Sequence, residues 1–154
     1  MGQQQLLLVI LVTIIVGIAT VVAINTFGSA ADSANIDAVR QDIATFAASA
    51  QGYFMKPEML GGGGGDWEGI TFNTVAFPAD EVANAGLTAV NANGVYTFAA
   101  PAATDTVFTI SGHPSSRIDG PVTATATATQ GNGPLIAEIG PGGINWNCAT
   151  CSNQ

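Results

Sequence analysis

Cationic side chains are scarce in this chain of 154 residues, which has only Arg40, Lys56 and Arg117 against eleven acidic residues. The formal net charge is −8, and charged residues make up 9% of the sequence. Binding to nucleic-acid phosphates needs several clustered cations, and adsorption to an anionic lipid surface needs a polybasic segment. The sequence therefore argues against nucleic acid as a partner and against electrostatic attachment to a membrane surface.

Side chains that commonly act in catalysis or bind metals are equally scarce. His113 is the single histidine, and its neighbours Pro114, Ser115 and Ser116 are interpreted as a turn. A zinc site takes about four ligands, and a hydrolytic nucleophile needs a base and an orienting third group. We therefore predict no catalytic residues, no metal and no cofactor, and a chain that is not an enzyme.

The two cysteines, Cys148 and Cys151, admit three interpretations. A structural disulfide in an oxidising compartment is favoured, and it would hold the tail near Trp146. A redox-active dithiol is expected beside a βαβ pattern, which this sequence does not show. Free thiols are the third alternative.

Neither charge nor proline is present in the N-terminal region, because the first charged residue is Asp32 and the first proline is Pro57. Residues 6–24 are aliphatic except for two threonines and one glycine. As an α-helix this run would span about 28 Å, close to the hydrocarbon thickness of a bilayer. Such a segment must lie in lipid or be buried among other copies of itself.

A cleavable secretory signal is the alternative interpretation of this run. Residues 1–5 lack the lysine or arginine of such signals, and the run exceeds their apolar core of ~7–15 residues. Cleavage near Ser29 and Ala31 stays open.

Residues 32–54 have helical periodicity, with apolar side chains at spacings of three and four. The apolar stripe is Ile36, Val39, Ile43, Phe46, Ala47, Ala50 and Tyr53, and the polar face is Asp32, Asn35, Asp37, Arg40, Gln41 and Asp42. Asp37 and Arg40 are spaced to form an ion pair. Lys56-Pro57 and the five glycines 61–65 should end the helix. We predict one helix of roughly fifty residues, ~75 Å long, with two helices broken near residues 25–28 as the alternative.

The remaining residues have the pattern of a small antiparallel sheet. Turn signals such as Asn93-Gly94, Thr104-Asp105 and Gly131-Asn132-Gly133 separate short segments of strand character. The predicted strands are residues 70–75, 95–99, 107–111, 122–129 and 135–139, and the fourth alternates threonine with valine or alanine. The stripe of the helix would cover the apolar face of four or five strands, giving an α+β, ladle-like architecture.

This organisation divides the chain into two predicted parts. Residues 1–56 form the long N-terminal helix, with 1–27 as its assembly or transmembrane part, and residues 57–154 form the sheet domain with a C-terminal tail. The glycine run 61–65 has no Lys-Ser/Thr after it and opens no helix, so it is interpreted as a linker and not as a phosphate-binding loop.

These features resemble a type IV pilin: an apolar helix that begins at the N-terminus, continues amphipathically and carries a small β-sheet domain. Over residues 1–70 the chain is also similar to pilin-like subunits of Bacteroidota-type bacteria. The residues that carry the similarity are the Met1-Gly2-Gln3-Gln4-Gln5 start, Ala34-Asn35-x-Asp37-Ala38-Val39, Gln51-x-Tyr53 and Lys56-Pro57 before the glycines.

Two positions depart from the family pattern. Type IV pilins usually carry a glutamate at the fifth mature residue, which neutralises the terminal amine of a neighbouring subunit. Here that residue is Gln5, or Leu7 if cleavage follows Gly2, and Val22 lies in the region of the usual helix-breaking proline. Our hypothesis is that the glutamines exchange hydrogen bonds between subunits in place of an ion pair.

The resemblance implies a major structural subunit of an extracellular, type IV pilus-like helical filament. Its expected partners are other copies of itself, the inner membrane before assembly, the pilus assembly machinery and a prepilin peptidase. The residues expected to mediate assembly are Gln3, Gln4, Gln5, Leu6, Leu7, Leu8, Ile10, Leu11, Ile14, Ile15, Gly17, Ile18, Val21, Val22 and Ile24. The alternatives are a minor pseudopilin of a secretion system and a membrane-anchored extracytoplasmic binding module. The role of the filament in adhesion, motility, DNA uptake or biofilm contact stays open.

Overall fold

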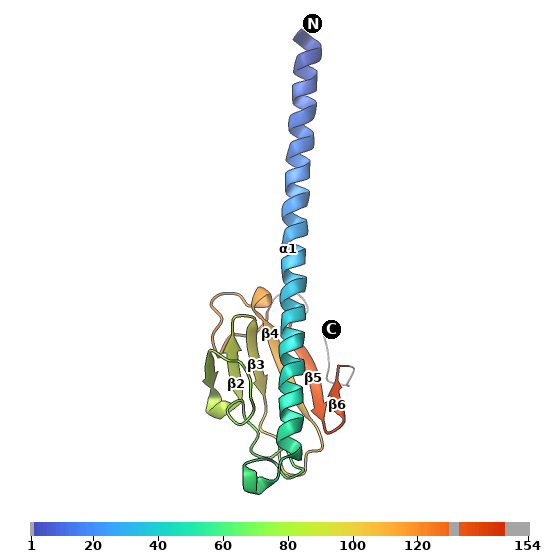
Figure 1. Ribbon diagram of the computed structural model, residues 1–154. Coiled ribbons are helices and arrows are strands. Elements are labelled where there is room, and N and C mark those ends of the chain that lie inside the picture. Colours follow the sequence, from blue (N-terminus) through green and yellow to red (C-terminus); the bar gives the residue numbers. More distant parts are fainter. Residues whose placement is uncertain (1, 130–132, 147–154) are drawn as a thin grey trace. The chain divides into compact units, whose positions relative to one another are not determined.

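The structure is a computed structural model that describes residues 2–129 and 133–146 of the chain. One long helix, α1 (Gly2–Met55), is followed by a six-stranded antiparallel sheet, which confirms the α+β class (Figure 1). The strands are β1 (Glu81–Ala83), β2 (Thr88–Asn91), β3 (Gly94–Phe98), β4 (Phe108–Pro114), β5 (Leu135–Gly140) and β6 (Gly143–Asn145), and the 3₁₀ helices are η1 (Glu58–Leu60), η2 (Asn84–Gly86) and η3 (Ser115–Arg117). The chain divides into two compact units, Met1–Ala34 and Asn35–Gln154.

Helix α1 is continuous over 54 residues, so the predicted single helix is confirmed and the alternative of two helices is wrong. Gly17 and Gly28 lie within it and do not interrupt it. The helix ends at Met55, immediately before Lys56 and Pro57. Proline disfavours helical geometry at the residue before it and cannot donate a backbone hydrogen bond, which explains the stop.

The sheet is a meander in which each strand pairs antiparallel with the next one along the chain. The turn between β2 and β3 is held by Asn91, whose side-chain oxygen accepts hydrogen bonds from the backbone N–H groups of Asn93 (2.9 Å) and Gly94 (3.1 Å). A side chain at Gly94 would collide with the carbonyl oxygen of His113 on β4. Position 94 therefore requires glycine, because the backbones of β3 and β4 approach each other closely there.

Three of the predicted strands are confirmed: 95–99, 107–111 and 135–139 correspond to β3, β4 and β5. The prediction for 70–75 is wrong, because these residues form turns whose apolar side chains enter the core. The prediction for 122–129 is also wrong, because this segment is not a strand of the sheet: it forms turns and an isolated bridge between Ala128 and Ile118, which lies outside the strands. The strands β1, β2 and β6 were not predicted, since each has only three or four residues.

The main core lies between α1 and one face of the sheet. The helix contributes the buried side chains of Val39, Ile43, Phe46, Ala47 and Ala50, which confirms the predicted stripe. The aromatic ring of Phe46 lies at the centre, with its centroid 4.8 Å from that of Phe72 and 5.5 Å from that of Phe98. Ile36 and Tyr53 pack at the edge of the same cluster.

A second, smaller core lies on β2 and β3 and consists of Val90, Val95 and Ile118. Val122, Ala124 and Ala126 pack against it, while the threonines between them are exposed. The alternation of residues 122–129 thus predicted which side chains face inward, although the segment covers the sheet and is not a strand of it.

The glycine run caps the C-terminus of α1. The N–H groups of Gly63, Gly64 and Gly65 donate to the carbonyl oxygens of Tyr53 (2.9 Å), Lys56 (2.9 Å) and Phe54 (2.8 Å). The last carbonyls of a helix lack partners within it, so this loop satisfies them. A side chain at Gly63 would collide with the Asp66 carbonyl oxygen, and Gly61, Gly64 and Gly65 have positive φ. The run is therefore a folded capping loop as well as a connection to the sheet.

Candidate assembly surface

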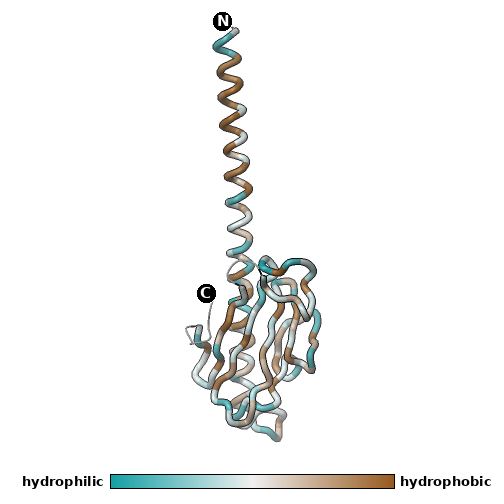
Figure 2. Tube along the Cα trace, turned by 180° about the vertical axis from the view of Figure 1, so that it is seen from behind, coloured by the Kyte–Doolittle hydropathy of each residue, from teal (hydrophilic) through white to brown (hydrophobic). Residues whose placement is uncertain are grey.

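Residues 6–24 of the first unit present an uncharged apolar surface on all sides of the helix. The aliphatic side chains of residues 6–24 are exposed, with exposed fractions from 48% at Val12 to 69% at Leu7. Figure 2 shows this run as the long hydrophobic part of the N-terminal helix. Each residue that the sequence predicts for assembly, from Gln3 to Ile24, lies on α1 and is exposed.

The hydroxyl groups within and just after this run are satisfied by the helix itself. The Oγ1 atoms of Thr13, Thr20 and Thr26 donate to the carbonyl oxygens of Ile10 (2.8 Å), Val16 (2.8 Å) and Val22 (2.9 Å). A hydroxyl bonded in this way does not need water as a partner. The three threonines are therefore compatible with a hydrocarbon environment or with a bundle of helices.

The size of the apolar surface decides where it can reside. Leaving ~15 large apolar side chains in water would cost on the order of 20–40 kcal/mol. Among the residues that the structure describes, α1 is one helix long and apolar enough to cross a membrane, by length and composition. The surface thus requires lipid or protein around it.

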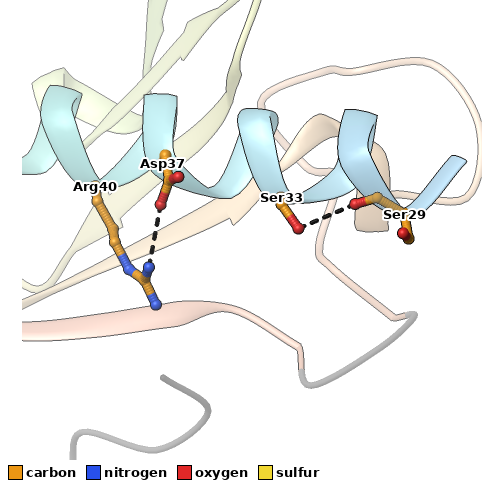
Figure 3. A network of polar contacts seen from close by, with 4 residues as sticks. All are labelled: Ser29, Ser33, Asp37 and Arg40. Atoms are coloured by element: carbon orange, nitrogen blue, oxygen red, sulfur yellow. Dashed lines mark hydrogen bonds and ion pairs between the residues drawn. The ribbon is translucent and has the colours of Figure 1, made fainter. Parts of the chain in front are cut away.

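Polar side chains follow the apolar run on α1, and Figure 3 shows four of them, Ser29, Ser33, Asp37 and Arg40. The Ser33 hydroxyl donates to the Ser29 carbonyl oxygen at 3.0 Å, and the Arg40 guanidinium lies 3.2 Å from the Asp37 carboxylate. This confirms the predicted ion pair. Because both side chains are substantially exposed, the pair contributes only a few tenths of a kcal/mol to stability.

Asp42 anchors α1 to the hairpin of β2 and β3. Its Oδ2 atom accepts hydrogen bonds from Tyr96 Oη (2.6 Å), Asn91 Nδ2 (2.9 Å) and Asn93 Nδ2 (2.8 Å). Burial of the Tyr96 ring, followed by the hydrogen bond to Asp42, raises the pKa of its hydroxyl. The sequence predicts Asp42 on the polar face of the helix, and the structure adds that its carboxylate is half-buried and meets three donors of the sheet.

His113 and Arg117 are buried near the end of β4 and hold the segment that crosses the second core. The backbone N–H of Ala128 donates to His113 Nδ1 at 3.0 Å, and Arg117 Nη1 donates to the carbonyl oxygen of Gly133 at 2.9 Å. Burial lowers the pKa of His113. The predicted turn is confirmed for Ser115 and Ser116, which lie in η3, whereas His113 and Pro114 belong to the strand β4. The hydrogen bonds of His113 and Arg117 stabilise the fold.

Within residues 2–129 and 133–146, no group of three or more His, Cys, Asp or Glu side chains is placed to hold a metal ion. Cys148 and Cys151 lie outside the described residues, so their predicted disulfide stays a prediction. Comparison with protein-family models, curated proteins and solved structures finds no match to this chain.

Proposed function

We propose that this protein is the major structural subunit of an extracellular, type IV pilus-like helical filament. The observation that carries the proposal is the apolar surface of residues 6–24, which is exposed on every side of the helix and contains no charge. A helix that packs against several neighbours needs apolar side chains around its whole circumference, whereas a helix on a single core needs one stripe. The second half of α1 has such a stripe and the first half does not.

Before assembly, the same surface resides in the inner membrane, and residues 25–154 lie outside the cytoplasm. Assembly exchanges lipid contacts for contacts between helices, with a prepilin peptidase and the assembly machinery as partners. Both states shelter the apolar side chains, so the hydrophobic effect disfavours a free soluble subunit without choosing between them.

The proposed subunit contact is heterologous, which means that two different surfaces of the same chain meet. Contacts of this kind that do not close on themselves generate an open helix, as filament growth requires. Gln3, Gln4 and Gln5 supply amide donors and acceptors at the start of the helix, and no charged residue precedes Asp32. The proposed filament core is therefore uncharged along the whole apolar run.

Electron microscopy of filaments sheared from cells, combined with N-terminal sequencing of their main component, tests the proposal. We expect this chain to be the dominant protein of the filaments. Finding it in cells exclusively as a membrane-embedded species, with no filament containing it, would refute the proposal. Finding it as a trace component would favour the minor pseudopilin instead.

A further inference from the structure

Within the described residues of the second unit, a conspicuous exposed apolar surface lies at the C-terminal end of α1. We call it the Met59 surface, and it consists of Phe54, Met55, Pro57, Met59 and Leu60. The exposed fractions are 98% for Met59, 72% for Met55 and 67% for Leu60. An open hollow of about 600 Å³ is lined by four of these residues, Phe54, Met55, Pro57 and Met59, together with Glu58, Gly64 and Gly65. Exposed apolar side chains gathered in one place indicate an interaction surface.

This surface is held in a fixed shape. The capping loop of glycines 61–65 bonds back to the last turn of α1, and the Leu60 N–H donates to the Pro57 carbonyl oxygen at 3.0 Å. The Phe54 ring is held by the core, because its centroid lies 4.6 Å from that of the buried Trp67 ring. A preorganised surface loses little conformational entropy when a partner binds it. Met59 is thus presented by a folded loop that is available for binding.

The first unit offers one aromatic side chain, Phe27, which is suited to this hollow. Phe27 is 75% exposed, more than any other large apolar side chain of residues 2–34. Asn25 and Thr26 separate it from the aliphatic run. It therefore lies just beyond the segment that is proposed to form the filament core.

We propose that Phe27 of one copy packs into the Met59 surface of a second copy in the assembled filament. This inference rests on the proposed function, because it concerns copies held together by their apolar helices. Aromatic rings and methionine sulfur attract each other, and flexible methionine side chains adapt to the shape of a ring. The contact is heterologous, so it extends the open helix and does not close a dimer.

The positions of charged residues are compatible with a second copy of this chain as the occupant of the hollow. Each copy carries a formal charge of −8, so contacts through acidic surfaces are repulsive. No charged residue lies within residues 25–31, and Lys56 and Glu58 beside the Met59 surface sum to zero. Residues 25–31 therefore add no further negative charge to the hollow, which Glu58 lines and Lys56 flanks.

Crosslinking in filaments tests the pair directly. In a background with Cys148→Ser and Cys151→Ser, Phe27→Cys and Met59→Cys are combined, and the filaments are treated with a short bismaleimide. We expect a ladder of covalent oligomers, because each copy then carries both halves of the contact. Co-expressed single variants should give discrete dimers. A control that pairs Phe27→Cys with Val82→Cys, on β1, should give neither.

A second measurement separates this inference from the proposed function. We expect Met59→Ser to lower filament yield by about tenfold, which corresponds to a loss of ~1.4 kcal/mol per contact. Met59→Leu should retain the yield because it conserves apolar volume. If the parent chain forms filaments but the Phe27–Met59 pair crosslinks no better than the control, the inference is wrong while the proposed function stands. Crosslinks from Met59→Cys solely to a different protein would overturn it too. If the parent chain forms no filaments, both the inference and the proposed function are wrong.

Discussion

The Tyr96 hydroxyl on β3 donates a 2.6 Å hydrogen bond to Oδ2 of Asp42 on α1. Tyr96 is fully buried, and the same oxygen accepts hydrogen bonds from two asparagine side chains of the β2–β3 hairpin. A carboxylate on the helix thereby bonds three side chains of the sheet. This single atom couples the formation of the hairpin to the docking of the second half of α1.

We expect Tyr96→Phe to lower the free energy of unfolding by about 1–3 kcal/mol, because the variant removes a buried hydrogen bond to a charged acceptor. Thermal unfolding of the detergent-solubilised chain, followed by near-ultraviolet circular dichroism, measures the change. Asp37→Asn is the matched control, because it removes the exposed Arg40 ion pair and should change stability by less than about 0.5 kcal/mol. Equal effects of the two variants would contradict the role given to Tyr96.

Alkaline pH should destabilise the fold through the same residue. The pKa of Tyr96 is raised above its ordinary value of 10.0, first by burial and then by its hydrogen bond to Asp42. The unfolded chain therefore releases the proton first, and stability that is fully present below pH 10 falls as pH rises above it. Unfolding midpoints from pH 9 to 11 should decline in the parent and decline less in Tyr96→Phe. Tyr53 contributes to the remaining slope, because its pKa is raised by burial first and then by Asp66.

Acidic pH should act through His113. Burial lowers the pKa of this histidine below its ordinary value of 6.5, so the unfolded chain takes up a proton before the folded chain does. Stability is fully present above pH 6.5 and is lost as pH falls below it. We expect the unfolding midpoint to fall between about pH 7 and pH 5.5, where carboxylates still contribute little. His113→Gln should flatten this dependence, and an unchanged slope would show that another group causes it.

Gly112 on β4 lies where side chains of α1 pack closely against the sheet. A side chain there would come within 2.7 Å of Val39 and 2.8 Å of Ile43 on the helix. We expect Gly112→Ala to destabilise the protein by about 1–3 kcal/mol through overpacking. Gly142→Ala is the control, because a methyl group at Gly142 meets nothing within 4 Å, and it should stay within about 0.5 kcal/mol of the parent. Denaturant unfolding of both variants provides the comparison.

The assembly surface is tested by changing shape without adding charge. Ile14→Trp keeps residues 6–24 apolar, so membrane insertion should be unaffected, but the larger ring disrupts packing between helices. We expect filament yield to fall by about tenfold, as ~1.4 kcal/mol per subunit implies, while the amount of chain in the membrane is unchanged. Ile14→Leu should behave as the parent. Normal filaments from Ile14→Trp would contradict close packing of this residue, and tolerance of any apolar scrambling would favour the membrane-anchored binding module.

The apolar surface of residues 6–24 was predictable from the sequence, because it depends on the types of residues that follow one another along the helix. Residues 6–24 are uncharged and aliphatic, and this is sufficient to predict a helix with an apolar surface. The Met59 surface was not predicted, because exposed methionines next to a glycine run suggest a flexible linker. The fold of the capping loop depends on hydrogen bonds to Tyr53, Phe54 and Lys56, which become available when α1 ends in place.

The sequence by itself determined the length of α1, its end at Met55, its buried stripe and the strands β3, β4 and β5. Each of these follows from a short-range signal, namely the spacing of apolar residues or the positions of proline and turn residues. Only the tertiary structure decided that residues 122–129 cover the sheet, that Asp42 faces the hairpin, and that the short strands β1, β2 and β6 form. An alternating segment buries one set of side chains equally well as a strand or as a cover, and a carboxylate becomes half-buried only when distant donors surround it. These outcomes depend on contacts between residues far apart in the chain, which local pattern does not encode.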